Sequence, residues 1–157
     1  MAMRLLWPMG AALLLTSGVA AQLPLPAPAA EEGFQELPLL QNDLILKAGS
    51  DRVFYAGNDH AVSVASRATL AAQARWLIAN PSVRAIVEGH SNERDTRDHA
   101  LALGARRASA VRDYLVALGV HPARLIVTTM GKERPVVPLP GVPASGVSAR
   151  VVLVIIR

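Results

Sequence analysis

The feature that decides the fold is the run Val87-Glu88-Gly89-His90-Ser91-Asn92-Glu93-Arg94-Asp95-Thr96. Its first residue ends the apolar sequence Ala85-Ile86-Val87, which predicts a short buried strand. Gly89 and the polar residues after it end that strand and open a loop. From about residue 97 to residue 118, apolar side chains recur at the spacing of one helix face. The run therefore predicts a strand, a polar loop and a helix in direct succession.

The predicted helix combines one apolar face with a pair of arginines, Arg106-Arg107. The residues of its apolar face are Leu101, Ala108, Val111, Leu115 and Leu118. Gly119 is expected to end the helix, because glycine adopts the left-handed C-terminal conformation without a Cβ penalty. A loop at the carboxyl end of a strand, facing a helical arginine, is suited to hold a carboxylate.

The rest of the chain predicts a sheet with two crossovers. Strands are expected at 43–47, 52–55, 125–129 and 151–156, the last of them buried on both faces because it is almost wholly apolar. Ser66 is expected to cap a second helix that ends at Asn80-Pro81, since a residue before proline avoids helical geometry. The buried stripe of this helix is expected to be Leu70, Ala74, Leu77 and Ile78. Two strand–helix–strand crossovers predict an α/β two-layer sandwich, in which a mixed sheet carries both main helices on one face.

The first residues have the layout of a secretory signal peptide. One cation, Arg4, precedes the apolar run 5–15, and the small residues that follow predict cleavage after Ala21. A retained membrane anchor is the alternative, although the apolar run is short for a span of about 20 residues. The next stretch is rich in Pro and Ala and is expected to form an extended linker. The predicted organisation is a signal peptide at 1–21, a linker at 22–42 and one domain at 43–157.

Composition narrows the function classes. The chain has a formal net charge of +4 and two residues each of Trp, Tyr and Phe, and its arginines do not form one long run. This pattern does not predict nucleic-acid binding, although a mild attraction to an anionic polymer is expected. The chain has no cysteine, so neither a disulfide nor a lipid attached to a cysteine is expected.

A longer set of residues around the same run resembles a known family. The matching residues are Val87-Glu88-Gly89-His90, Glu93-Arg94, Thr96, Leu103-Gly104, Arg106-Arg107-Ala108 and Ala110-Val111. They resemble the peptidoglycan-binding domain of the OmpA-like family, and most closely its peptidoglycan-associated lipoprotein branch. The likeness extends from about Val53 to Val136 and, more loosely, to the C-terminus. It implies the same two-layer α/β sandwich.

The resemblance also implies a ligand and the residues that bind it. In this family the domain binds the free carboxylate and amine of diaminopimelate in the peptide stems of peptidoglycan. The arginine that binds the carboxylate corresponds to Arg107, and the aspartate that binds the amine corresponds to Asn92. The candidate binding residues are Asn92, Arg107, Asp95, Thr96, Arg150 and Ala56. No cofactor and no metal are implied.

Several of these positions depart from the family pattern. Asn92 accepts a hydrogen bond from an ammonium without the charge of an aspartate, which is expected to cost about 1–2 kcal/mol of binding energy. Asp95, three residues later, is a candidate to restore a negative charge near the amine. Ala100 stands where the family has an asparagine, and the polar run after the first strand is reduced to Ala56-Gly57-Asn58. One of two paired arginines before the last strand is kept, as Arg150.

Catalytic and metal-binding patterns are weaker. Glu88, His90 and Glu93 lie close together in the sequence, but no second histidine stands at ligand spacing, so a structural role is expected for His90. The sequence contains no Gly-x-Ser-x-Gly nucleophile elbow, and no enzymatic activity is expected.

Two functions remain open at this point. The first is a periplasmic protein that binds peptidoglycan and helps link the outer membrane to the cell wall. The second is a degenerate domain that has lost this ligand and binds an envelope protein, such as a component of the Tol system or an outer-membrane protein. Members of the lipoprotein branch carry a lipid-bearing cysteine at the cleavage site, which this chain lacks.

Overall fold

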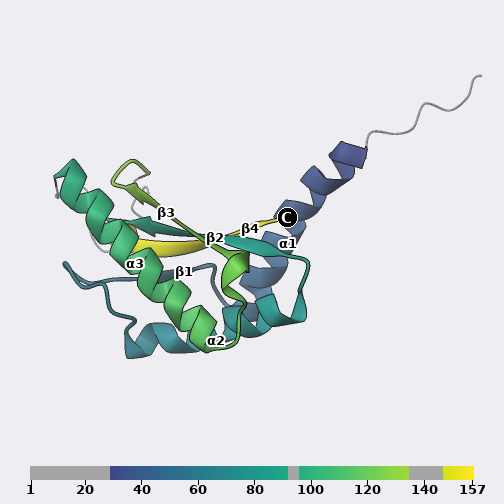
Figure 1. Cartoon of the computed structure of the whole chain (residues 1–157), viewed down its shortest axis with the longest axis horizontal. Coiled ribbons are helices and arrows are strands. Elements are labelled where there is room, and N and C mark those ends of the chain that lie inside the picture. Colours follow the sequence, from purple (N-terminus) through teal and green to yellow (C-terminus); the bar gives the residue numbers. More distant parts are fainter. Residues whose placement is uncertain (1–28, 92–95, 135–146) are drawn as a thin grey trace, which may run out of the picture.

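The computed structural model describes residues 29–91, 96–134 and 147–157 (Figure 1). Its elements are α1 (Ala29–Ala48), β1 (Arg52–Phe54), α2 (Val64–Ala79), β2 (Arg84–His90), α3 (Arg97–Ala117), a 3₁₀ turn (Pro122–Arg124), β3 (Leu125–Gly131) and β4 (Arg150–Ile156). Within these ranges no helix is long and apolar enough to cross a membrane. The predicted signal peptide and the first part of the predicted linker lie outside the described residues.

The four strands form one mixed sheet in the order β1-β4-β2-β3. β2 pairs with β3 in parallel and with β4 in antiparallel, and β4 also pairs in antiparallel with β1. β1 and β2 are therefore parallel strands separated by β4. Helix α2 connects β1 to β2, and α3 connects β2 to β3, which are the two predicted crossovers (Figure 1). The predicted two-layer architecture with a mixed sheet is confirmed.

The core lies between the sheet and one face each of α2 and α3. The strand residues that point into it from β2 and β4 are Ala85, Val87, Val151, Leu153 and Ile155. The helices contribute Leu70, Ala74, Leu77, Ala108, Val111 and Leu115, which recur at the helical spacing that the sequence predicted. Two residues predicted to be buried, Ile78 and Leu118, are instead 49% and 37% exposed, because they lie at the ends of their helices.

Two glycines set how closely α3 approaches the sheet. A Cβ on Gly89 of β2 would lie 1.8 Å from the carbonyl oxygen of Gly104 in α3, and a Cβ on Gly104 would lie 2.4 Å from Oγ1 of Thr129. Neither position accepts a side chain without separating the helix from the sheet. The Thr129 hydroxyl also donates to the carbonyl of Leu101 at 3.1 Å, which ties β3 to α3. The helix that carries Arg107 is therefore held in close contact with β2.

Two predicted boundaries differ from those in the structure. β2 continues through Gly89 to His90, although the sequence predicts its end at Val87, because Gly89 serves the contact with α3 rather than a turn. Ser63, and not Ser66, caps α2. The side-chain oxygen of Ser63 accepts the backbone N–H of Ser66 at 3.2 Å, so the helix begins three residues earlier than predicted.

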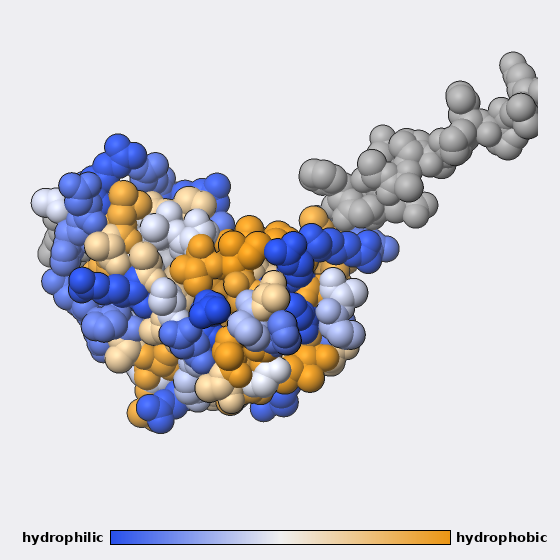
Figure 2. Space-filling model, viewed as in Figure 1, coloured by the Kyte–Doolittle hydropathy of each residue, from blue (hydrophilic) through white to orange (hydrophobic). Residues whose placement is uncertain are grey.

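Strand β4 is an interior strand, as predicted, but the prediction that both of its faces are buried is wrong. Val151, Leu153 and Ile155 on one face are at most 4% exposed. Val152, Val154 and Ile156 on the other face are half-buried. Both main helices cover the first face, so the apolar residues of the second face reach the surface. Figure 2 shows apolar side chains gathered over the strands, beside the hydrophilic end where α3 begins.

Helix α1 is the largest departure from the sequence-based expectations. The sequence predicts a linker at 22–42 and a strand at 43–47, but Ala29–Ala48 form one helix with Pro38 inside it. Leu40, Leu44 and Ala48 recur every four residues and pack against the core, and Leu44 is fully buried. Packing of this stripe offsets the cost of the proline, which is about 3 kcal/mol. The folded domain therefore begins before the predicted boundary.

Helix α1 also completes one edge of the sheet. β1 pairs with β4 only as far as Arg52 and Val152. Beyond that point, Oε1 of Gln41 accepts the N–H of Ile155 at 2.9 Å and Nε2 of Gln41 donates to the carbonyl of Leu153 at 3.0 Å. The side-chain amide takes the place of the strand backbone that β1 does not supply, so these groups of β4 are satisfied.

Candidate ligand-binding site

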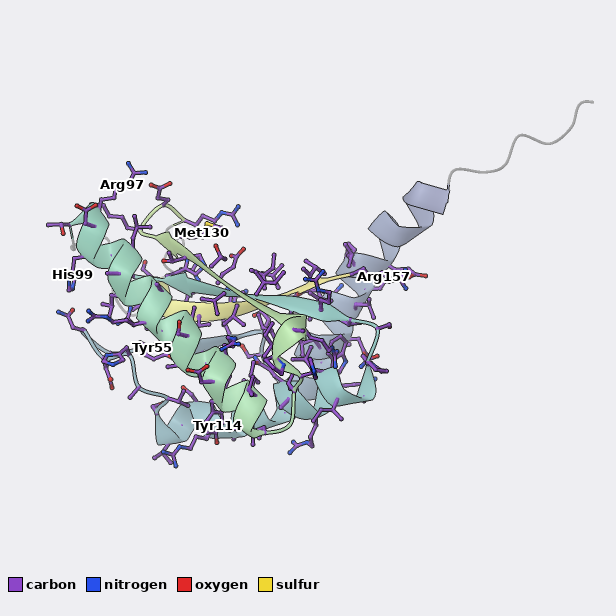
Figure 3. All side chains as sticks on the ribbon, viewed as in Figure 1. Tyr55, Arg97, His99, Tyr114, Met130 and Arg157 are labelled. Carbon is purple, nitrogen blue, oxygen red and sulfur yellow. The ribbon has the colours of Figure 1, made fainter. Side chains whose placement is uncertain are left out.

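One end of the sheet gathers the residues that the sequence singled out. β1 and β2 are parallel, so their carboxyl ends meet at the same edge, and the antiparallel β4 begins there. Helix α3, which begins after β2, crosses this end, and Figure 3 shows Tyr55 beside α3. We call this region the Arg107 site; it comprises Tyr55, Gly57, Asp59, His90 and Arg107.

Arg107 is the centre of this site and is fully buried. Its Nε donates to the carbonyl of Asp59 at 2.8 Å, its Nη2 to the carbonyl of Gly57 at 2.6 Å and its Nη1 to the carbonyl of His90 at 3.2 Å. The guanidinium also lies over the ring of Tyr55, with 4.9 Å between Cζ and the ring centroid. One side chain of α3 thus ties together the loop after β1 and the end of β2.

These contacts explain how a guanidinium can be buried at this position. A buried charge destabilises the fold unless its polar atoms are paired. Arg107 is surrounded by three main-chain carbonyls and one aromatic face. Two of the carbonyls lie in the loop after β1, and the third belongs to the last residue of β2. The sequence predicts that Arg107 faces the loop after β2. The structure adds contacts with the carbonyls of Gly57 and Asp59 in the loop after β1, where the sequence had singled out Ala56.

Tyr55 was missed as a candidate by the sequence analysis. Its side chain is 8% exposed, and its hydroxyl has no hydrogen-bond partner in the part of the chain that the structure describes. Burial raises the pKa of this hydroxyl to about 12, although the nearby Arg107 charge opposes the shift. The hydroxyl therefore stays protonated and can donate a hydrogen bond. The one sequence signal was an aromatic residue placed directly after a strand at the edge where the ligand was expected.

The other predicted binding residues lie in different settings. Thr96 is exposed and caps α3, where its hydroxyl accepts the N–H of His99 at 3.3 Å. Ala56 is exposed in the loop after β1. Asn92 and Asp95 lie outside the described residues. Ala56 is adjacent in the chain to Tyr55 and Gly57, and neither Ala56 nor Thr96 contributes a buried functional group to the Arg107 site.

Arg150 does not join Arg107. Successive residues of a strand point to opposite faces of the sheet, and the next residue, Val151, points to the helices. Arg150 therefore lies on the opposite side of the sheet from the helices. Its guanidinium donates to the carbonyls of Ser148 at 3.3 Å and of Arg134 at 3.0 Å, while its Nε has no partner among the described residues. Burial, with repulsion from Arg52, lowers the pKa of Arg150.

His90 lies next to Arg150 and is 2% exposed. Neither ring nitrogen has a hydrogen bond within the described ranges, although Oε2 of Glu88 lies 3.5 Å from Nε2. Burial lowers the pKa of His90 to about 4, with further contributions from Arg150 and Arg134. His90 is therefore a neutral, buried and incompletely satisfied side chain at neutral pH. Only its main-chain carbonyl takes part in the Arg107 site.

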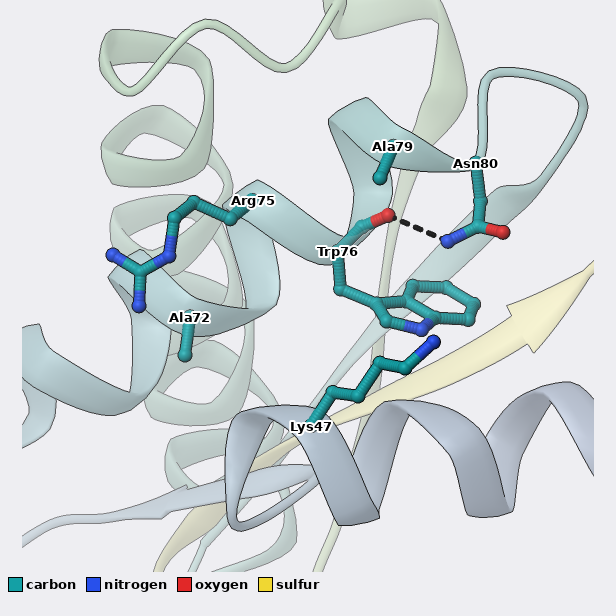
Figure 4. Close-up of a pocket in the computed structure, with 6 residues that line it drawn as sticks. All are labelled: Lys47, Ala72, Arg75, Trp76, Ala79 and Asn80. Carbon is teal, nitrogen blue, oxygen red and sulfur yellow. Dashed lines mark hydrogen bonds between the residues drawn. The ribbon is translucent and has the colours of Figure 1, made fainter.

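A separate hollow lies between α1 and α2, away from the Arg107 site. It has a volume of about 250 Å³ and is lined by Lys47, Ala72, Arg75, Trp76, Ala79 and Asn80 (Figure 4). Its polar groups are largely paired within the fold. The indole of Trp76 donates to Asp43 at 2.7 Å, which lowers the pKa of that carboxyl, and Nδ2 of Asn80 donates to the carbonyl of Trp76 at 2.8 Å. This hollow gives no sign of a ligand.

The Arg107 site holds hydrogen-bonding groups of both kinds. Arg107 and Tyr55 carry donors, and the three carbonyls that Arg107 binds each have a second lone pair. Among the described residues, no three His, Cys, Asp or Glu side chains are grouped so as to hold a metal ion.

Comparison with known sequences gives a consistent result. The sequence profile of the OmpA family matches residues 54–139. The chain is 41% identical over 135 residues to the peptidoglycan-associated lipoprotein of Rhizobium meliloti, covering 82% of this chain and 76% of that protein. It is 39% identical over 127 residues to the peptidoglycan-associated lipoprotein of Agrobacterium fabrum, covering 78% of this chain and 71% of that protein.

Comparison with solved structures agrees with this result. The crystal structure of the peptidoglycan-associated lipoprotein from Burkholderia pseudomallei superposes with a TM-score of 0.62 at 33% sequence identity. The superposition covers 68% of this chain and 91% of that one. The matched profile spans the end of β1, α2, β2, α3 and β3, so all five residues of the Arg107 site fall within the region of similarity.

Proposed function

The chain belongs to the OmpA family, and from that premise we propose that it is a non-catalytic protein of the cell envelope that binds peptidoglycan. The ligand is the diaminopimelate residue of the peptide stem, and the protein helps link the outer membrane to the cell wall from the periplasm. The names of its relatives support the association with peptidoglycan. The observation that carries the proposal is the buried Arg107, held in one orientation where the ends of β1 and β2 meet α3.

The three carbonyl contacts give Arg107 a fixed orientation before any ligand arrives. A preorganised group loses little conformational freedom on binding, so more of the interaction energy appears as affinity. In this proposal the diaminopimelate carboxylate binds on the guanidinium side of the site, and the amine binds toward the carbonyls at the ends of β1 and β2. Asn92, which lies outside the described residues, is the expected acceptor for the amine. Asn92 accepts a hydrogen bond without a charge, so we expect weaker binding than an aspartate would give.

Co-sedimentation with purified peptidoglycan sacculi tests this proposal. The expected result is that the protein pellets with sacculi whose stems contain diaminopimelate, and that soluble diaminopimelate-containing muropeptides release it. Sacculi whose stems contain lysine at the same position are the matched control, because lysine lacks the second carboxylate. Equal pelleting with both types of sacculi, or with neither, overturns the proposed ligand.

A second candidate function is a protein-interaction module in the envelope. It is favoured by Asn92 at the predicted amine site and by the extent to which Arg107 already serves the fold. In that case the same surface binds a component of the Tol system or an outer-membrane protein. The experiment separates the two, because such a domain stays in the supernatant with either type of sacculi and co-purifies with the partner protein instead.

A further inference from the structure

The Tyr55 hydroxyl is a buried group at the Arg107 site that forms no hydrogen bond with the described part of the chain. The side chain is 8% exposed, and its oxygen has no hydrogen-bond partner in the described part of the chain. Removing a hydroxyl from water without a new partner destabilises a protein. Such groups are rare in folded proteins, and each one needs an explanation.

The position of Tyr55 is fixed by its neighbours rather than by its hydroxyl. Its backbone N–H donates to the carbonyl of Ala149 at 2.8 Å, which extends the pairing of β1 with β4 by one residue. The Arg107 guanidinium covers one face of the ring, with 4.9 Å from Cζ to the centroid. The sheet therefore fixes the backbone of Tyr55, and the Arg107 cation covers one face of its ring. The hydroxyl projects from the rim of a ring whose orientation is already set.

We propose that the Tyr55 hydroxyl is a ligand-binding donor that shares a carboxylate of the bound ligand with Arg107. This inference rests on the proposed function and adds a specificity-determining residue to it. A hydroxyl and a guanidinium in contact with the same ring lie close enough for one carboxylate to accept hydrogen bonds from both. A hydrogen bond to an ionised acceptor is roughly twice as strong as a neutral one, so this contact favours an acid over its amide.

The phenol is suited to this role in the free protein. Burial holds its pKa at about 12, so it is protonated at any physiological pH and donates rather than accepts. A donor that is already buried and oriented loses little freedom when the ligand binds. The contact also strengthens the carboxylate side of the site.

The chain offers a matched control for this inference, because it contains two tyrosines. Tyr114 lies on α3 two turns beyond Arg107, and Figure 3 shows it toward the end of the helix opposite His99. Tyr55→Phe and Tyr114→Phe each remove one hydroxyl and nothing else. Affinity for a soluble muropeptide with a free diaminopimelate side-chain carboxylate is measured by calorimetry, beside thermal melts of all three proteins.

The expected result is that Tyr55→Phe binds about tenfold more weakly than the parent, while Tyr114→Phe binds like the parent. The melting temperature of Tyr55→Phe stays the same or rises, because the lost hydroxyl has no partner in the free protein. With a muropeptide whose side-chain carboxyl is amidated, the difference between the parent and Tyr55→Phe shrinks. In the Tyr114→Phe protein, Tyr55 is the single tyrosine, and its ¹³Cζ resonance shifts when the muropeptide is added.

The outcomes distinguish this inference from the function on which it rests. If the parent binds and Tyr55→Phe binds equally well, the inference is overturned and peptidoglycan binding stands. If the loss is the same for the free acid and the amide, the hydroxyl does not contact the carboxylate and the inference is again overturned. If the parent binds neither sacculi nor muropeptide, the proposed function fails, and the inference fails with it.

Discussion

Two arginines hold opposite ends of the sheet in the same way, and their surroundings differ. Arg124 precedes β3, and its Nε donates to the carbonyl of Val83 at 2.8 Å, while its Nη2 donates to the carbonyls of Asn80 at 2.7 Å and Leu77 at 2.9 Å. These carbonyls end α2 and lead into β2. Arg107 binds three carbonyls at the other end. Each arginine satisfies main-chain groups that leave regular structure.

The difference lies in the polar atoms around the two arginines. Within the described ranges, the buried side-chain atoms without a partner are Oη of Tyr55, Nδ1 and Nε2 of His90, Oγ of Ser148 and Nε of Arg150. Their residues follow β1, end β2, or precede and begin β4, so all of these atoms lie at the Arg107 end of the sheet. Tyr55 is in contact with Arg107, whereas Arg150 lies on the opposite side of the sheet. Around Arg124, the main-chain groups at the end of α2 are paired. A buried arginine alone does not indicate a binding site. The unpaired hydroxyl beside Arg107 is a feature that Arg124 lacks among the described residues.

The largest expected effect comes from Gly89→Ala. The new Cβ would lie 1.8 Å from the backbone of Gly104, so α3 must move away from β2 and Arg107 loses its contact with His90. We expect urea denaturation to show a loss of at least about 3 kcal/mol in the free energy of unfolding. Ala85→Gly, on the same face of β2 at the Arg124 end, is the control and should cost about 1 kcal/mol. Parent-like stability of Gly89→Ala would contradict the close packing of α3 on β2.

Arg107→Met and Arg124→Met compare the two ends directly. Each variant keeps a long side chain and removes the donors from its three carbonyls. Arg107 is fully buried and Arg124 is half-buried, so water can replace the lost donors only at the second site. We expect losses of about 3 kcal/mol for Arg107→Met and about 1–2 kcal/mol for Arg124→Met in urea denaturation. Equal losses would mean that the two ends do not differ in burial.

The sheet and its core could be predicted because both rest on side-chain periodicity. Val87 lies in an apolar run, and Ala108, Val111 and Leu115 recur at helical spacing, so the local pattern and the buried faces agree. The sequence pattern overestimated the burial of β4, because an apolar strand has the same sequence pattern whether one of its faces or both are covered. The half-buried Val152 shows the difference.

Helix α1 could not be predicted, because its stabilisation comes from distant contacts. Proline and alanine before residue 38 indicate an extended linker. The apolar stripe that includes Leu44 stabilises a helix only because it packs against the core of the folded domain. Gln41 is a further example. Its side chain bonds the backbone of β4 more than 100 residues later, and nothing in the local sequence indicates that.

The sequence predicted the position of Arg107 but not the groups that surround it. Arg107 was identified from its motif, and the structure places it at the expected end of the sheet. Its partners are main-chain carbonyls, and that of Asp59 lies 48 residues earlier in the chain. Carbonyls leave no signature in a sequence, so the sequence indicated Ala56 in the loop after β1 but neither these carbonyl contacts nor Tyr55.

Acid should destabilise the Arg107 end through His90. Its pKa is about 4 in the folded state and 6.5 in the unfolded chain, so below pH 6.5 the unfolded state binds more protons. The free energy of unfolding should therefore fall between pH 6.5 and pH 4, by at most about 3 kcal/mol. His90→Leu should remove this dependence, whereas the same change at the exposed His99 should leave it. The pH dependence of urea denaturation measures both, and an unchanged slope in His90→Leu would assign the acid effect to another group.

The smallest expected effect comes from comparing a buried hydroxyl that forms no hydrogen bond with one that does. Ser148 is 1% exposed and its Oγ has no partner among the described residues, so Ser148→Ala should leave the free energy of unfolding unchanged or raise it by up to about 1 kcal/mol. Thr129→Val is the matched comparison, because its Oγ1 donates to Leu101 and accepts the N–H of Gly131. Loss of that hydroxyl should cost about 1 kcal/mol. Urea denaturation of both variants in parallel measures the two changes in the free energy of unfolding. We expect a loss for Thr129→Val and no loss for Ser148→Ala. If Ser148→Ala costs as much as Thr129→Val, then the Ser148 hydroxyl has a partner in solution, and the contrast between the two ends of the sheet is weaker than the contacts indicate.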